Sequence, residues 1–139
     1  MGKNNSEIRE DKNQMYNEIK NVYDKISAAF GIQDIKTVLS YFSDSNEMVK
    51  VSNGIIIRGK KELSDYFHKR IGQLERLSIR IENIQLNIID ETHLWTVADE
   101  FVTYSGQTHK AVVSNIFIKT KDGWKILLDH TTYLESNGN

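Results

Sequence analysis

The amino-acid sequence predicts an α+β fold in which three helices cover one face of a curved, mostly antiparallel sheet of about six strands. Up to residue 71, apart from one short hairpin, apolar residues recur with the period of a helix. From residue 77 to residue 134 they alternate with polar residues, as in strands that have one buried face. Turn sequences separate these runs: Asn53-Gly54, Asp90-Glu91-Thr92, Ser105-Gly106-Gln107 and Asp122-Gly123. Helices that precede an antiparallel meander and cover it define the α+β class.

The three helices are expected in the first half of the chain. Residues 1–5 are expected to be disordered, and Ser6 to cap a long amphipathic helix that ends at Gly31. Asp34 is expected to cap a second, shorter helix. The third is expected over Lys60–Ile71, because its apolar residues fall on one side and a glycine follows.

The strands are expected as one short hairpin and a four-strand meander. Asn53-Gly54 favours a two-residue turn, because both residues tolerate the positive φ angles of that turn. The hairpin strands are 48–52 and 55–58, and the meander strands are 77–89, 93–104, 108–120 and 124–134.

Composition bounds the function. The chain of 139 residues is long enough for one domain, expected to span 1–139, and its net charge of -1 indicates neither a nucleic-acid nor a membrane partner. Absence of cysteine excludes disulfides and thiolate metal sites, and no apolar run is long enough to span a bilayer, so a cytoplasmic protein is expected. His68, His93 and His109 show no metal-ligand spacing, and no metal or cofactor is expected.

The turns predict which strand residues share a face. If the last turn has two residues, Asn115 faces His130, and if the preceding turn centres on Gly106, Asp99 faces Val113. The helix-covered face would then carry Trp95, Val97, Asp99, Phe101, Val113, Asn115, Phe117, Trp124, Ile126, Leu128, His130 and Thr132. The opposite face would expose an apolar patch suited to a homodimer, made of Ala98, Val102, Val112, Ile116, Leu127 and Tyr133.

Two stretches of the chain resemble a known family. They are Asn53-Gly54 with Arg58-Gly59-Lys60-Lys61-Glu62-Leu63, and Asp122-Gly123-Trp124-Lys125-Ile126 with His130-Thr131-Thr132. From about residue 15 to 133 the chain resembles the NTF2-like superfamily, in its SnoaL-like or DUF4440-type branch. The resemblance implies a cone whose curved sheet wraps a pocket roofed by the helices, and frequent dimers through the sheet. Members include isomerases, cyclases, dehydratases, transport factors and a kinase association domain, so the fold does not choose the function.

The expected site is a polar cluster on the helix-covered face: Asp99, Asn115, His130 and Thr132. Buried ionisable groups of this kind either satisfy one another or line a cavity. In the first hypothesis the cavity binds a small, largely apolar molecule, with Trp95, Phe101, Phe117, Tyr23 and Tyr66 as further candidate ligand contacts. In the second, Asp99 or His130 is the general base of a cofactor-independent isomerase, cyclase or dehydratase; related isomerases use a pocket carboxylate, which Asp99 resembles in kind. A non-enzymatic dimerisation or assembly module is the third.

Overall fold

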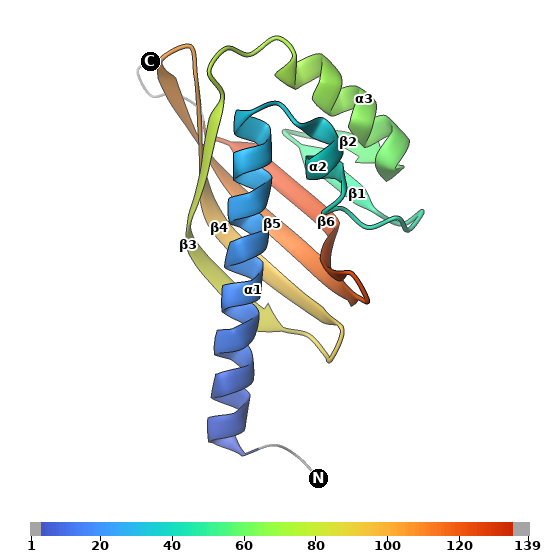
Figure 1. Cartoon of the computed structure of the whole chain (residues 1–139), viewed down its shortest axis with the longest axis vertical. Coiled ribbons are helices and arrows are strands. Elements are labelled where there is room, and N and C mark those ends of the chain that lie inside the picture. Colours follow the sequence, from blue (N-terminus) through green and yellow to red (C-terminus); the bar gives the residue numbers. More distant parts are fainter. Residues whose placement is uncertain (1–3, 135–139) are drawn as a thin grey trace.

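The structure is a computed structural model that describes residues 4–134, with the backbone alone at residues 6 and 8–10 (Figure 1). The elements are α1 (Asn5–Gly31), α2 (Ile35–Leu39), β1 (Val49–Ser52), β2 (Ile55–Arg58), α3 (Gly59–Ile71), β3 (Ser78–Ile88), β4 (His93–Tyr104), β5 (Gln107–Thr120) and β6 (Gly123–Tyr133). The predicted α+β class, with three helices before a four-strand meander, is confirmed. Within these described residues no helix is long and apolar enough to cross a membrane.

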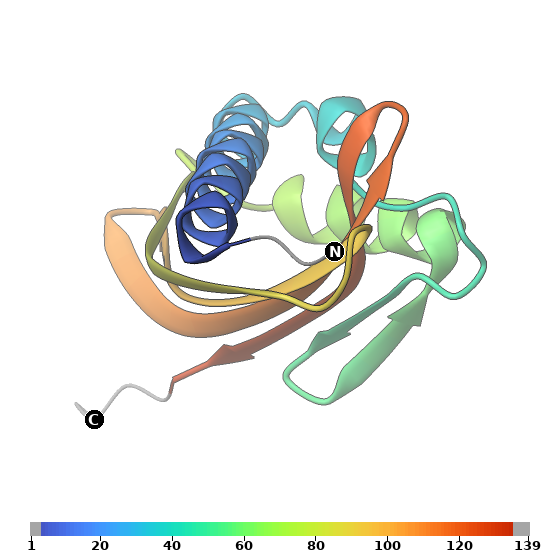
Figure 2. The same ribbon diagram turned by 90° about the horizontal axis from the view of Figure 1, so that it is seen from below.

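The strands form one six-stranded sheet in the order β2-β1-β6-β5-β4-β3. Neighbours pair antiparallel except β1 and β6, which run parallel. Figure 2 shows the sheet curving beneath α1 and α3, which lie on its concave side. The short hairpin therefore extends the meander beyond β6 and lengthens the wall on that side.

Local sequence explains where the helices begin. The Asn4 side chain accepts a hydrogen bond from the Glu7 amide at 2.9 Å, and the Glu7 carboxylate accepts one from the Asn4 amide. The predicted cap at Ser6 is wrong, and Asn4 and Asn5, predicted to be disordered, begin the helix; residues 1–3 lie outside the described residues. The predicted cap at Asp34 is confirmed by its bond from the Thr37 amide at 3.1 Å.

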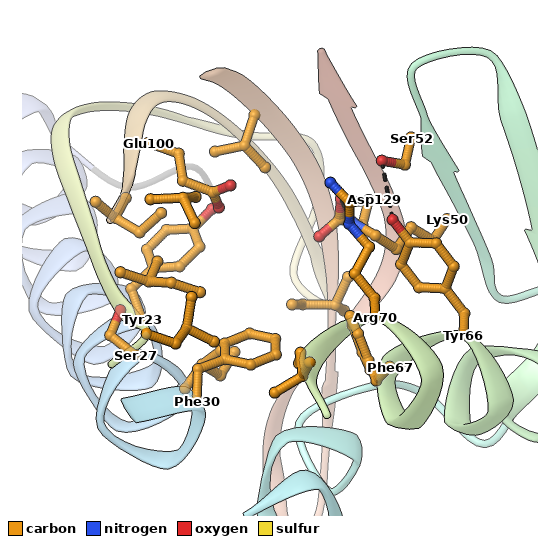
Figure 3. A pocket seen from close by; sticks show the side chains of 18 of the residues that line it. Tyr23, Ser27, Phe30, Lys50, Ser52, Tyr66, Phe67, Arg70, Glu100 and Asp129 are labelled. Atoms are coloured by element: carbon orange, nitrogen blue, oxygen red, sulfur yellow. Dashed lines mark hydrogen bonds and ion pairs between the residues drawn. The ribbon is translucent and has the colours of Figure 1, made fainter. Parts of the chain in front are cut away.

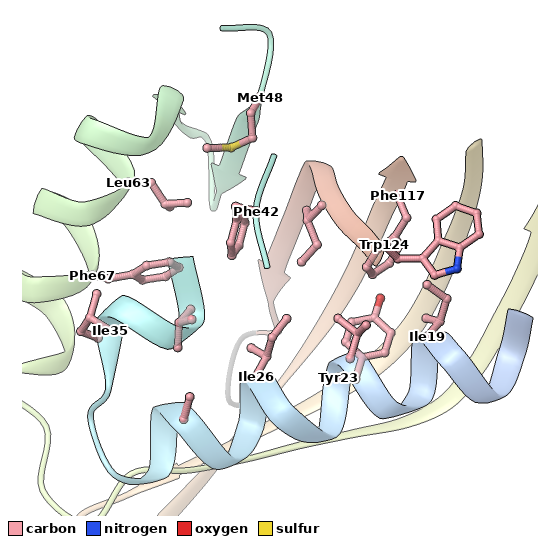
Figure 4. Packing of buried hydrophobic residues seen from close by; sticks show 14 of the residues in the cluster. Ile19, Tyr23, Ile26, Ile35, Phe42, Met48, Leu63, Phe67, Phe117 and Trp124 are labelled. Carbon is pink, nitrogen blue, oxygen red and sulfur yellow. The ribbon is translucent and has the colours of Figure 1, made fainter. Parts of the chain in front are cut away.

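The core lies between α1 and the sheet (Figure 4). Ile19, Tyr23 and Ile26 on α1 are buried one helical turn apart, as the amphipathic pattern predicts. The Tyr23 ring meets the Phe117 ring edge-on, with centroids 5.7 Å apart, and Phe117 is fully buried. This contact anchors α1 above β5.

The predicted register between β4 and β5 is wrong by one residue. Ser105 and Gly106 both have positive φ, 51° and 79°, and form a two-residue turn that pairs Tyr104 with Gln107. The prediction centred the turn on Gly106, with Ser105 beside it. In the structure Ser105 is itself a turn residue with a positive φ, which is uncommon for a residue other than glycine. Asp99 consequently pairs with Val112 and not with Val113.

The register between β5 and β6 differs in another way. The turn residues are Lys121 and Asp122, and a bulge opposite Ile116 and Phe117 adds one residue to β6. Asn115 therefore pairs with Asp129 and not with His130.

Because side chains alternate across a strand, a one-residue shift exchanges the faces. On β4 the helix-covered residues are Thr96, Ala98, Glu100 and Val102, and on β6 beyond the bulge they are Asp129, Thr131 and Tyr133. The predicted placement of Trp95, Asp99, Phe101, His130 and Thr132 on this face is wrong. The predicted inward face of β5, with Val113, Asn115 and Phe117, is confirmed. Of the predicted outer patch, Ala98 and Val102 are instead buried, and Tyr133 lies on the helix-covered face.

Candidate functional site

A cavity of about 90 Å³ lies between the helices and the concave face of the sheet. Its lining is mostly apolar and comes from every layer: Ile26 and Phe30 on α1, Phe67 and Ile71 on α3, Leu77 before β3, Ile79 and Ile81 on β3, and Val102 and Val113 on the sheet floor. A space of this size exceeds what one water molecule fills and suits a small organic molecule.

Polar side chains stand on two opposite sides of the cavity (Figure 3). Glu100 and Tyr23 lie on one side, and Lys50, Ser52, Tyr66, Arg70 and Asp129 lie on the other. They come from strands and helices far apart in the sequence, so the fold alone brings them together.

The Glu100 carboxyl group has no hydrogen-bond partner in the described part of the chain. The residue is half-buried, and among the described residues no side chain donates a hydrogen bond to its carboxyl group. Its neighbour across the strands on the same face is Ala111, whose small side chain leaves room above the sheet. Burial, together with the negative charge of Asp129, raises the pKa of Glu100 to about 7, although the charge of Lys50 acts to lower it.

A buried ion pair closes the opposite side. The Lys50 ammonium lies 3.0 Å from the Asp129 carboxylate, and the Thr131 hydroxyl donates to the same carboxylate at 2.8 Å. Burial works against the charge on Lys50, but the charge of Asp129 and its hydrogen bond outweigh burial and raise the pKa of Lys50. Lys50 is therefore a cation at neutral pH, and the Asp129 carboxylate neutralises its charge.

The tyrosines differ in their bonding. The Tyr23 hydroxyl donates to Asn115 Oδ1 at 2.5 Å and bonds to Thr96 Oγ1 at 2.7 Å, while Asn115 Nδ2 donates to the Leu128 carbonyl. Burial raises the pKa of Tyr23, so it stays a neutral phenol within a satisfied network. Tyr66 donates to Ser52 Oγ at 3.3 Å.

The pKa of the Tyr133 hydroxyl is affected by charged groups on both sides of the cavity. Burial raises the pKa of the Tyr133 hydroxyl, the charge of Glu100 raises it further, and Arg70 lowers it. Tyr133 is thus a neutral donor within range of both Glu100 and Arg70.

Three of the residues predicted for the site from sequence line this cavity: Asn115, Tyr23 and Tyr66. Phe117 is buried in the adjoining core. The others, Asp99, His130, Thr132, Trp95 and Phe101, lie on the other face of the sheet and line no part of it.

On that outer face Asp99 has partners of its own. It accepts a hydrogen bond from Asn83 at 2.8 Å and lies 3.7 Å from the Lys110 ammonium. Phe101 packs beneath the Arg80 guanidinium, 4.6 Å from its ring centroid.

Sequence reasoning missed Glu100, Asp129, Lys50 and Arg70. The first two are direct neighbours of the predicted Asp99 and His130, and the correct turn at Ser105-Gly106 would have found Glu100. Lys50 reaches the site only because β1 joins β6, a pairing that no local pattern announces. No group of three or more histidine, aspartate and glutamate residues suited to a metal ion occurs in the part of the chain that the structure describes.

A curved sheet that wraps a cavity beneath N-terminal helices is the architecture of the NTF2-like superfamily. Residues 19–133 match the model of the SnoaL-like domain, and the chain belongs to that family. The resemblance predicted from the sequence is confirmed. A search of curated proteins found no match.

Solved structures support the same fold. A protein of unknown function from Mycobacterium tuberculosis superposes with a TM-score of 0.81 at 13% identity, over 93% of this chain and 77% of that chain. An NTF2-like protein of unknown function from Shewanella oneidensis gives 0.72 at 18% identity, over 84% and 98%. A protein with a cystatin-like fold from Nostoc punctiforme gives 0.74 at 16% identity, over 86% and 90%. At these identities the likeness establishes the fold alone.

Removing one member of the Lys50–Asp129 pair should destabilise the protein strongly. Asp129→Leu leaves a buried ammonium without a counter-charge, and we expect a loss of about 3–5 kcal/mol in the free energy of unfolding. Replacing both members, as Lys50→Met with Asp129→Leu, should cost much less than the single change. Urea unfolding monitored by circular dichroism measures both values, and equal losses in the single and double variants would contradict this account.

Proposed function

We propose that the protein binds a small, largely apolar molecule in the cavity between the helices and the sheet. The observation that carries the proposal is the Glu100 carboxyl group, which faces the mostly apolar cavity without a hydrogen-bond partner among the described residues. A carboxyl group in such a place destabilises the fold, because its charged form has lost water without gaining a hydrogen bond. A mostly apolar cavity with a few polar groups, one of them unpaired, is typical of a binding site for a small molecule.

The other polar groups of the cavity strengthen this argument by contrast. Tyr23 and Asn115 satisfy each other, and Lys50 and Asp129 do the same. A purely structural cluster would be satisfied throughout, since unpaired buried polar groups are rare. Glu100 is half-buried, not fully enclosed, and its carboxyl group faces the cavity without a hydrogen-bond partner from residues 4–134.

Filling the cavity should abolish binding. Val113→Phe adds a ring on the cavity floor, whereas Val112→Phe adds the same ring one residue earlier on the outer face. We expect ligand-observed NMR with indole, p-cresol and phenylacetamide to detect binding to the wild type and to Val112→Phe, but not to Val113→Phe. Overpacking costs roughly 1–3 kcal/mol, so the folded state of both variants is checked by thermal unfolding. Equal binding by the two variants would contradict the proposed site.

Proton transfer is a second candidate function, favoured by the pKa of Glu100. A carboxyl group with a pKa of about 7 is divided between acid and base at neutral pH, which suits a general base. Tyr133 is a neutral phenol within electrostatic range of Glu100 and could donate to an enolate oxygen. The chemistry would be that of an isomerase, cyclase or dehydratase, with Glu100 in the role that the sequence suggested for Asp99 or His130.

Deuterium exchange tests the base directly. We expect the wild type to catalyse α-deuteration of a small ketone, phenylacetone, with a rate that rises with pH as Glu100 loses its proton, with a midpoint near 7. Glu100→Gln should lower that rate about 10²-fold or more. Asp99→Asn, on the opposite face, is the matched control and should leave it unchanged. Loss of exchange in Asp99→Asn with retention in Glu100→Gln would assign the base to Asp99 instead.

A homodimer through the outer face of the sheet is also proposed. Apolar side chains reach across this face from β2 to β4, with Ile56 52% and Val112 37% exposed. Val97 and Phe101 lie between polar neighbours on the same face, Ile116 lies between Trp95 and Leu128, and all three are half-buried. An exposed apolar surface of this extent favours a partner with the same surface.

Charge placed at the centre of this face should separate the dimer. We expect the wild type to have the mass of two chains in size-exclusion chromatography with light scattering, and Val112→Arg to have the mass of one. Ile32→Arg is the control, because Ile32 is 77% exposed at the end of α1, away from the sheet. A wild-type mass of one chain would exclude the dimer.

A further inference from the structure

The charges around the cavity are unequally matched. Lys50 and Asp129 neutralise each other at 3.0 Å. Arg70, an exposed residue in the last turn of α3, also lines the cavity; its side chain bonds to the Tyr133 hydroxyl, and within residues 4–134 its guanidinium forms no ion pair with a carboxylate. With the Glu100 carboxyl group protonated, Arg70 is the uncompensated charge of the lining, and the cavity is a cationic site with apolar walls.

The geometry around Arg70 suits a planar anion. Figure 3 shows Arg70 on the same side of the cavity as Tyr66 and Ser52, with Glu100 on the far side. A guanidinium offers two parallel donors that match the two oxygens of a carboxylate. Phe30, Phe67 and Leu77 supply apolar surface between the two polar sides.

We propose that the ligand is a small monocarboxylate whose anion binds the Arg70 guanidinium and whose apolar body lies among Phe30, Phe67 and Leu77. The inference rests on the proposed binding function and names its ligand class. A cavity of about 90 Å³ limits the apolar body to the size of one ring or a short chain.

An amine is the competing ligand class, because it would complement Glu100. Two observations disfavour it. Arg70 repels a cation at the same cavity, and a carboxyl group with a raised pKa is half neutral at pH 7. A carboxylate ligand is favoured over an amine, since its attraction to Arg70 does not require Glu100 to be ionised.

The binding should also depend on pH. The charged and titratable groups that face Glu100 are Asp129 and Tyr133 on β6, Lys50 on β1, Tyr23 on α1, and Tyr66 and Arg70 on α3. The side chains of β3 that line the cavity are apolar. Glu100 is thus the group expected to change charge between pH 6 and 8, and its ionisation weakens the binding of an anion.

Isothermal titration with three isosteric probes tests the ligand class: phenylacetate, phenylacetamide and 2-phenylethylamine. At pH 6 we expect phenylacetate to bind the wild type about tenfold more tightly than the amide, the effect of one charge-assisted hydrogen-bonded pair. Arg70→Gln should reduce phenylacetate to the affinity of the amide. The exposed neighbour Lys69 provides the matched control, since Lys69→Gln removes the same charge outside the cavity lining. Raising the pH to 8 should weaken phenylacetate severalfold in the wild type but not in Glu100→Gln.

The outcomes separate the two proposals. Equal affinity for phenylacetate and phenylacetamide, or tighter binding of the amine, overturns the carboxylate and leaves the binding function in place. An equal loss in Arg70→Gln and Lys69→Gln overturns the role of Arg70. Failure of all three probes and of indole to bind the wild type overturns the binding function itself.

Discussion

The buried pair of Lys50 and Asp129 is the interaction on which the shape of the site depends. It joins β1 to β6, two strands that run parallel, and helps to hold the short hairpin beside the meander. An ammonium in this position is tolerable only with its carboxylate, so the two strands are held in one register. The same pair removes two charges from the cavity and leaves Glu100 and Arg70 as the groups that face it without a charged partner. Lys50 and Asp129 thus stabilise the sheet, whereas Glu100 and Arg70 are the groups proposed to act on a ligand.

The bulge in β6 is the second constraint. Before it, Trp124 and Ile126 point into the core; after it, Asp129 and Thr131 do. A regular strand would have kept Leu128 and His130 inward and exposed Asp129, so the ion pair could not have formed. One additional residue therefore turns Asp129 and Thr131 inward in place of Leu128 and His130. Small residues complete the arrangement, since Ala98 and Ala111 lie on the floor where larger side chains would fill the space.

These features explain how far the sequence could predict the molecule. Elements and class followed from periodicity, and Asn53-Gly54, with φ of 46° and 85°, behaves as its dipeptide predicts. On β6, the predicted turn lies one residue too late, which shifts the pairing by two residues and leaves Trp124 and Ile126 on the correct face, because the side-chain period is two. On β4, an error of one residue exchanged Asp99 for Glu100. Neither Ser105 at positive φ nor the bulge beside Phe117 carries a strong local signal, and the parallel contact of Lys50 depends on residues almost 80 positions away.

Membership of the SnoaL-like family accounts for the fold but not for the chemistry of the cavity. That chemistry depends on which polar groups of the lining already have hydrogen-bond partners. Tyr23, Thr96 and Asn115 form a closed network on the cavity floor, which gives the floor one rigid conformation. Glu100 stands two residues from Ala98 and four from Thr96 on the same strand face, yet it has no such network. An amide donor on the neighbouring strand would have satisfied it, but Ala111 occupies that position. The fold gives the other polar groups of the cavity floor hydrogen-bond partners but leaves this carboxyl group without one. The unpaired carboxyl group lowers the stability of the protein. Proteins retain losses of that kind where a ligand or a reacting group restores the missing contact.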